Sequence, residues 1–216
     1  MARKVGSAGK TLARRLGRIA LVLLGFGFAV WLLVQLFAPW MGALALPLAF
    51  LAVMRLLQDK EVEREVVAKA RGYLGEARVG RVLEALPSPW RVFHDVDLGG
   101  ENADHVVVGP AGVFNVEVKN YTGLIRATPQ GLWVRGERRD DLVRQAWRQA
   151  HKLRELLGVE VEPLLVFVGG RLEGRRVGRL PVLPPEEVGA DLRGLPARLS
   201  FTEAQRVSKL LEGRVR

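Results

Sequence analysis

The chain of 216 residues contains no cysteine, which excludes disulfide bonds and thiolate metal sites and leaves its redox compartment open. It has only three histidines, and neither a Ser-His-Asp arrangement nor a zinc-ligand spacing is visible. Acidic residues are missing altogether before Asp59, whereas seven basic residues lie there: Arg3, Lys4, Lys10, Arg14, Arg15, Arg18 and Arg55. Much of the formal net charge of +10 is therefore typical of a membrane flank, not of a DNA-binding face.

Two apolar runs follow residues 1–18, which we expect to form a basic cytoplasmic tail. Residues 19–37 contain one polar side chain, Gln35, and as a helix would span about 28 Å, close to the bilayer hydrocarbon thickness. Residues 41–57 form the second run. Because both flanks are basic and the connecting loop is uncharged, we expect a transmembrane helical hairpin in the cytoplasmic membrane, with both termini in the cytoplasm. A cleaved signal peptide and a buried helical hairpin of a soluble protein are the alternatives.

The strongest pattern in the chain lies in residues 101–123. Two β-type runs, Ala103–Val108 and Val113–Asn120, flank the sequence Gly-Pro-Ala-Gly, which suits a type I turn. This arrangement predicts a β-hairpin. A turn centred on its Pro-Ala pair gives a register in which the numbers of facing residues sum to 221.

In this register Asp104 faces Glu117 on the neighbouring strand, and Lys119 lies on the same face of the sheet. Two carboxylates this close repel each other unless a cation lies between them. Hard oxygen ligands favour Mg²⁺, with Mn²⁺ as a second choice. A bulge at Gly112 would instead turn the two acids to opposite faces, and a sheet edge with ordinary charges is the other alternative.

A helix is predicted over residues 59–86, where apolar side chains recur at helical spacing. Gly72, Glu76 and Gly80 are four residues apart and share one stripe of this helix. The glycines would let the helix approach a sheet closely and direct Glu76 toward the metal. The alternative is a helix break near Gly72 that leaves Glu76 in water.

The rest of the chain predicts alternating strands and helices: a strand at 90–98, a hairpin at 124–134, a helix at 140–157, strands at 160–168 and 180–183, and a helix at 201–212 that begins with a Ser200–Glu203 capping box. Residues 169–179 are predicted as a loop. Its arginines Arg171, Arg175 and Arg176 suit phosphate contacts, although a disordered basic turn is an equal alternative.

Several of these motifs together resemble the NERD, or nuclease-related, domain of the PD-(D/E)xK nuclease superfamily, over roughly residues 70–185. The matching motifs are Gly75-Glu76, Ala103-Asp104-His105, Gly112-Val-Phe114, Glu117-Val-Lys119-Asn120, Gly123 and Gln145. The chain departs from the superfamily pattern where Ala103 stands in place of a proline before Asp104. The resemblance implies an α/β, restriction-endonuclease-like core with a mixed central sheet flanked by helices. This core would occupy residues 59–190, after the transmembrane hairpin and before a C-terminal helical extension at 191–216.

A protein of this kind would be a membrane-anchored, Mg²⁺-dependent nuclease that hydrolyses phosphodiester bonds of DNA. Asp104, Glu117 and the main-chain carbonyl of Val118 would hold the metal, and Glu76 would complete a second metal position or anchor a water bound to the metal. Lys119 would orient or activate the attacking water, or stabilise the charge that grows on the phosphate.

Two glutamines on the 140–157 helix complete the expected site. By the resemblance, Gln145 supports the active site or contacts the phosphate backbone, and Gln149 shares its helix face; a solvated polar face is the alternative. We expect His94, His105 and His151 to be scattered and not to bind metal. Two other functions stay open: a non-catalytic nucleic-acid-binding scaffold, and a membrane protein whose hairpin is the functional part.

Overall fold

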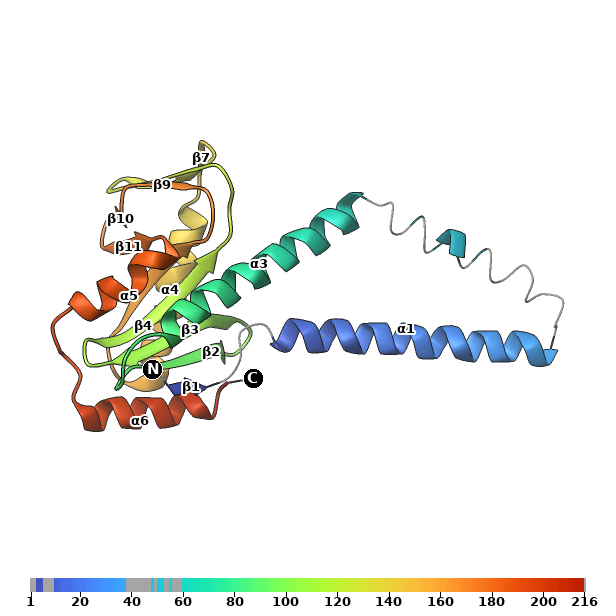
Figure 1. The fold of residues 1–216 in the computed structure, drawn as a ribbon, viewed down its shortest axis with the longest axis horizontal. Helices are drawn as coiled ribbons and strands as arrows, with labels where there is room; N and C mark the ends of the chain where they lie inside the picture. Colours follow the sequence, from blue (N-terminus) through green and yellow to red (C-terminus); the bar gives the residue numbers. More distant parts are fainter. Residues whose placement is uncertain are drawn as a thin grey trace. The chain divides into compact units, whose positions relative to one another are not determined.

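The computed structural model describes residues 3–5, 10–37, 48, 50–52, 55 and 60–215. The chain divides into two compact units, one formed by Met1–Gly9 with Gly72–Arg216 and the other by Lys10–Arg71 (Figure 1). All the residues predicted for the active site belong to the first unit.

A mixed sheet of seven described strands forms the centre of the first unit, in the order β1-β2-β3-β4-β8-β11-β10. The strand β3 runs antiparallel to both of its neighbours, β2 and β4, whereas β4, β8 and β11 are parallel. This arrangement confirms the predicted mixed sheet of an α/β core. The strand bounds are β1 Arg3–Val5, β2 Arg91–Asp97, β3 Asn102–Gly109, β4 Gly112–Lys119, β8 Val161–Phe167, β10 Arg176–Val177 and β11 Leu180–Leu183.

Helices cover both faces of this sheet (Figure 1). On one face, α3 (Lys60–Glu84) and α5 (Pro185–Gly194) contribute Val79, Leu83, Val188 and Leu192 to a core that includes Val107. On the other face, α4 (Asp140–Leu157) and α6 (Phe201–Glu212) pack against Val106 and Val108. Neighbouring residues of β3 thus enter different cores, as strand alternation requires.

The β3–β4 hairpin has the predicted register. The facing pairs run from Gly109–Gly112 to His105–Val116, so their numbers sum to 221 without a bulge at Gly112. The turn is held close to the preceding segment, because a Cβ atom on Gly109 would overlap the indole ring of Trp90. Asp104 therefore lies one position beyond the last of these pairs, next to Glu117 across the hairpin.

A second sheet of four described strands has the order β7-β6-β5-β9. Its strands are β5 (Leu124–Thr128), β6 (Gly131–Val134), β7 (Glu137–Arg138) and β9 (Arg171–Glu173). Ile125 of β5, Leu132 of β6 and Leu142 of α4 belong to one buried hydrophobic cluster. The prediction of a loop over residues 169–179 is wrong, because this stretch contributes β9 to the second sheet and β10 to the first.

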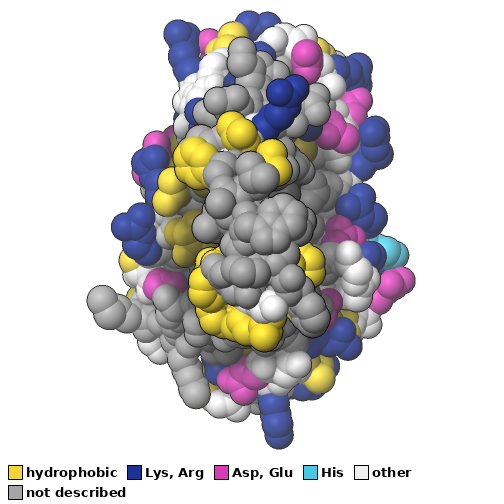
Figure 2. Space-filling view, turned by 90° about the vertical axis from the view of Figure 1, so that its right-hand side faces the viewer, with side chains coloured by type: hydrophobic (Ala, Val, Ile, Leu, Met, Phe, Trp, Pro, Cys, Tyr) yellow, Lys and Arg dark blue, Asp and Glu magenta, His cyan; other side chains and the backbone are white. Residues whose placement is uncertain are grey.

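The second unit contains α1 (Lys10–Phe37), which covers the first predicted membrane span. Its large apolar side chains are exposed, for example Leu21 and Leu24 at 71% and 72%. Hydrophobic side chains are also seen grouped on the face drawn in Figure 2. Within the described ranges no helix is both long and apolar enough to cross a membrane. The predicted hairpin is therefore not confirmed, and most of its second span, 41–57, lies outside the described residues.

Candidate active site

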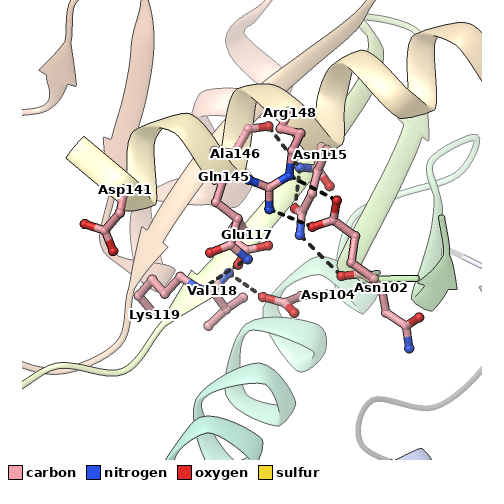
Figure 3. Close-up of polar contacts among 12 residues, drawn as sticks. Asn102, Asp104, Asn115, Glu117, Val118, Lys119, Asp141, Gln145, Ala146 and Arg148 are labelled. Carbon is pink, nitrogen blue, oxygen red and sulfur yellow. Dashed lines mark hydrogen bonds and ion pairs between the residues drawn. The ribbon is translucent and has the colours of Figure 1, made fainter. Parts of the chain in front are cut away.

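The hairpin brings the two predicted strand acids together at its open end. Asp104 Oδ2 accepts a hydrogen bond from the main-chain nitrogen of Val118 at 2.7 Å, across the two strands (Figure 3). Glu117 and Lys119 lie on β4 at the same end, and the Lys119 Nζ atom is 2.6 Å from Glu117 Oε1. Asp104, Glu117, Lys119 and Glu76 of α3 are called the acidic cluster below, because three of the four are carboxylic acids.

The carboxylate of Glu117 is the most constrained group of this cluster, with only 1% of the residue exposed. Its Oε1 atom accepts two hydrogen bonds, from Lys119 Nζ and from Gln145 Nε2 at 2.7 Å (Figure 3). Its Oε2 atom is buried and has no hydrogen-bond partner among the described residues. A buried polar atom left unpaired costs about 1–3 kcal/mol, and more when it carries charge. Such an atom therefore indicates a place where a ligand with positive charge would be stabilising.

The ionisable groups of the cluster show the effect of the crowded negative charge. Burial, followed by the charges of Asp95 and Glu117, raises the pKa of Glu76 to about 7. Burial and the neighbouring Glu117 and Glu76 raise the pKa of Asp104 well above its usual range. Burial alone would lower the pKa of Lys119, but the charge and hydrogen bond of Glu117 outweigh it and raise the pKa. The positive charge of Lys119 alone therefore does not balance the negative charge of the three acids in the cluster.

The helix α4 supports the cluster from its polar face. Gln145 reaches Glu117, whereas Gln149 is 1% exposed and contacts other groups. The Gln149 side chain accepts a hydrogen bond from Asn115 Nδ2 at 3.1 Å and donates one to the Asn102 carbonyl at 3.3 Å. It therefore fixes the start of β3, two residues before Asp104.

The loop before β3 is also held by charge. Glu101 accepts hydrogen bonds from Arg148 and Lys152 of α4, at 2.9 Å and 2.7 Å for the shortest contacts. The hydrogen bond from Arg148 is the largest cause that lowers the pKa of Glu101 to about 2. Together with Gln149, these bonds join α4 to the strand that carries Asp104.

The three arginines predicted to bind phosphate are not brought into this cluster by any described contact. Arg171 lies 2.8 Å from Glu173, and Arg175 makes a two-pronged pair with Glu187 at 2.7 Å and 2.8 Å. Arg176 is exposed on β10. Ion pairs with nearby carboxylates thus hold two of the three.

Sequence reasoning missed Asp95, a further acid near the cluster. Asp95 lies on β2 with a φ of 54°, and its Oδ1 atom accepts a hydrogen bond from Asn102 Nδ2 at 2.6 Å. Its Oδ2 atom is buried without a partner in the described part of the chain. In the sequence, Asp95 and Asp97 alternate with apolar residues of the same strand. This pattern does not distinguish a solvent-exposed strand edge from an active site.

The expectation that the histidines are scattered is wrong for two of them. His94 and His105 face each other across β2 and β3, and their Nδ1 atoms are 2.8 Å apart. Both residues are completely buried. His151 lies apart on α4, 3.3 Å from Glu155.

Whether these residues could hold a metal ion depends on how their donor atoms are arranged. Over residues 60–215 and the other described segments, no group of three or more His, Cys, Asp or Glu side chains is arranged to hold one. The donor chemistry still fits Mg²⁺, because the available ligands are carboxylate oxygens and two of these, on Glu117 and Asp95, are buried without partners. The raised pKa values of Glu76 and Asp104 point the same way, since a cation would lower both.

Comparisons with known proteins support the nuclease-related resemblance for part of the chain. Residues 71–168, which contain the whole cluster and Gln145, match the family model of NERD, the nuclease-related domain. An uncharacterized protein of Bacillus anthracis is 35% identical over 103 residues, which are 44% of this chain and 48% of that protein. The chain thus matches about half of the length of this relative.

A structural similarity was also found, to Pyrococcus furiosus SfsA in complex with Ca²⁺. It covers 66% of this chain and 54% of that chain, with 13% sequence identity and a TM-score of 0.25. A score this low supports no conclusion about the fold or the site.

Proposed function

We propose that this chain is a metal-dependent nuclease that hydrolyses phosphodiester bonds, with DNA as its substrate. The observation that carries the proposal is the buried carboxylate of Glu117, with one oxygen bound by Lys119 and Gln145 and the other without a partner. Asp104 and Glu76 surround it with further negative charge. The match of residues 71–168 to a nuclease-related domain agrees with this chemistry.

The metal would be Mg²⁺, with Mn²⁺ as a substitute, held by Glu117, Asp104 and the main-chain carbonyl of Val118, while Glu76 would complete a second position. When bound, it would polarise a phosphate oxygen and lower the pKa of a bound water. Lys119 has a raised pKa and so stays charged at neutral pH. Its proposed role is therefore to stabilise negative charge on the phosphate or to orient water, and not to remove a proton.

Other groups would orient the site and the substrate. The Gln145 amide fixes Glu117 through the Oε1 atom and would keep Oε2 turned away from α4. Gln149 would act indirectly, through the start of β3. Arg171, Arg175 and Arg176 are proposed to contact the phosphate backbone, for which two of them would exchange a carboxylate partner for a phosphate.

The chain is further proposed to attach to the cytoplasmic membrane through residues 19–57, with both termini and the nuclease-like domain in the cytoplasm. The support is the run of basic residues without any acid before Asp59, together with the exposed apolar side chains of α1. Membrane attachment would restrict the enzyme to DNA close to the bilayer.

The test is cleavage of DNA and RNA by the full-length protein with Mg²⁺, with Mn²⁺ and with EDTA. Asp104→Asn and Lys119→Ala are compared with Lys209→Ala, which removes an exposed lysine of α6. We expect cleavage that requires metal, is lost in the first two variants and is kept in the third. Cleavage that survives both changes in folded protein would place the chemistry elsewhere.

A second candidate function is a non-catalytic nucleic-acid-binding scaffold on the same fold. It is favoured by the lack, in the described segments, of any three acidic or histidine side chains already arranged around a metal. Tight DNA binding that is unaffected by EDTA, with no cleavage of any substrate, would support the scaffold over the nuclease.

A further inference from the structure

The two buried histidines connect the acidic cluster to the helix that carries Glu76. The His105 Nε2 atom lies 3.1 Å from the main-chain carbonyl oxygen of Glu76, on α3. Its Nδ1 atom lies 2.8 Å from His94 Nδ1. The other ring nitrogen of His94, Nε2, lies 3.1 Å from Glu84 Oε1, two turns further along α3. The imidazoles are packed edge to face, with centroids 4.9 Å apart.

The chemistry of the partners assigns the protons. The Glu76 carbonyl only accepts, so His105 Nε2 must carry a hydrogen and donate it. Burial, with the neighbouring His94, lowers the pKa of His105 to about 3, so this ring is neutral and its Nδ1 atom accepts. The short Nδ1–Nδ1 contact therefore requires that His94 donates from Nδ1. Its Nε2 atom faces the Glu84 carboxylate, which only accepts, so His94 carries a hydrogen on both nitrogens. His105 thus accepts from His94 and donates to the Glu76 carbonyl.

The helix lies close against this pair. A Cβ atom on Gly80 would be 3.3 Å from His94 Cε1 and 3.4 Å from His105 Cε1, closer than ordinary van der Waals contact. A Cβ atom on Gly75 would similarly lie 3.2 Å from the Cβ atom of Asn120. The glycines thus permit the approach that lets the imidazole reach the helix main chain.

His105 also directly follows Asp104 on β3, and strand alternation turns the two side chains to opposite faces. Asp104 therefore belongs to the acidic cluster, while His105 next to it binds the main chain of Glu76, the acid that α3 contributes to the cluster. The hydrogen bond from His105 joins the two elements at the point where their acids must meet.

We propose that His105, braced by His94, is a positioning residue that holds Glu76 of α3 against Asp104 and Glu117. The effect of this positioning on catalysis rests on the proposed nuclease function, but the positioning itself does not. Neither histidine touches the substrate in this proposal. Both act through the main chain of Glu76.

Two substitutions of His105 separate positioning from packing. A Gln side chain places its amide nitrogen near the position of Nε2, so His105→Gln can still donate to the Glu76 carbonyl. An Asn side chain ends near the position of Nδ1, so His105→Asn keeps a polar group beside His94 but cannot reach Glu76. Both variants disturb the histidine pair, and only one loses the bond to the helix. His151→Asn, on the exposed side of α4, is the control for changing a histidine.

Three measurements on the full-length protein test the proposal. Imidazole ¹⁵N NMR of the wild type should show neutral His105 protonated at Nε2 and His94 protonated at both ring nitrogens. In metal-free protein, hydrogen exchange of the main-chain amides around Glu76 on α3 should be as slow in His105→Gln as in the wild type, and faster in His105→Asn, which loses the bond to the helix. With DNA and Mg²⁺, His105→Asn should lose about tenfold or more in kcat with KM within about twofold, whereas His105→Gln should retain most of kcat.

The outcomes are distinguishable. If wild-type protein cleaves no nucleic acid, the proposed function fails, while hydrogen exchange around Glu76 still decides the positioning. If folded His105→Asn keeps the wild-type hydrogen exchange around Glu76, the positioning proposal is overturned. The same holds if His105→Gln behaves like His105→Asn, because the histidine would then serve packing alone. A His105 ring protonated at Nδ1 would overturn the assigned hydrogen bond itself.

Discussion

Replacing Glu76 by Gln should change how the stability of the protein depends on pH. The pKa of Glu76 is raised from 4.5 to about 7 by burial and by the charges of Asp95 and Glu117. A Gln side chain resembles the protonated acid in shape and hydrogen bonding but cannot ionise. The variant therefore removes the charge that the fold disfavours and leaves the packing of α3 nearly unchanged.

The sign and size of the effect follow from linkage. Below about pH 4.5 the acid is protonated in both the folded and the unfolded chain, so wild type and variant should have similar free energies of unfolding. Between pH 4.5 and 7 the unfolded chain releases the proton that the folded protein keeps, so the wild type loses stability as pH rises. A change in pKa from 4.5 to about 7 corresponds to roughly 3 kcal/mol at pH values above both. We expect Glu76→Gln to be more stable by up to this amount at pH 8.

The assay is urea unfolding of the full-length protein in EDTA at several pH values from 4.5 to 8.5, followed by circular dichroism. Glu160→Gln is the matched control, because its side chain is 84% exposed and its loss should not change the pH dependence. Added Mg²⁺ should reduce the advantage of the variant at pH 8, since a cation would stabilise the charged acid. A difference between Glu76→Gln and wild type that is the same at all pH values would refute the reasoning.

Three further predictions concern other parts of the structure. Gly72→Ala should raise the free energy of unfolding by about 0.5–1 kcal/mol, because an added Cβ atom meets nothing within 4 Å and alanine favours the helix. Gly80→Ala should lower the free energy of unfolding by about 1–3 kcal/mol, because its Cβ atom would crowd two imidazoles. Denaturant titration measures both changes, and equal effects would contradict the packing of α3. Gln145→Ala removes one of the two hydrogen-bond donors to the buried Glu117 carboxylate. In steady-state cleavage assays it should reduce kcat about tenfold to a hundredfold with little change in KM. An unchanged kcat would show that the Gln145 amide has no role in catalysis. Because the chain has no cysteine, single introduced cysteines report the membrane topology. On intact cells, a membrane-impermeant maleimide should label Gly42→Cys, whereas it should label His151→Cys only after lysis. Labelling of both variants before lysis would contradict the proposed topology.

The hairpin that carries the acids was accessible from the sequence because its determinants are local. The turn sequence sets the register within four residues, and β-type alternation then fixes which side chains share a face. The observed pairing of His105 with Val116 is the one that brings Asp104 beside Glu117. Long periodic segments were equally clear, and α4 begins and ends at the predicted residues. The Ser200–Glu203 capping box likewise begins α6.

Elements that depend on distant partners were not predictable in the same way. The strand β9 consists of Arg171–Glu173 and has no alternating apolar pattern, so it forms only because β5 offers it a parallel edge. The strand β1 lies within the predicted basic tail and pairs with β2, far along the chain. The helix α5 begins with Pro185 at its first turn, where proline is favoured, but its two adjacent prolines resemble a loop.

The acids and the histidines of the site differ in how far the sequence predicts them. The register of the β3–β4 hairpin places Asp104 and Glu117 together, and their mutual repulsion indicates a compensating cation. The histidines have no metal-ligand spacing, and their contact depends on the β2–β3 register, which makes His94 and His105 neighbours. In the structure, the His105 ring on one face of β3 contacts the main-chain carbonyl of Glu76 on α3, and the Glu76 carboxyl group lies near the acids on the other face. The placement of an acid proposed to be catalytic can therefore depend on a buried polar group on the opposite face of the sheet.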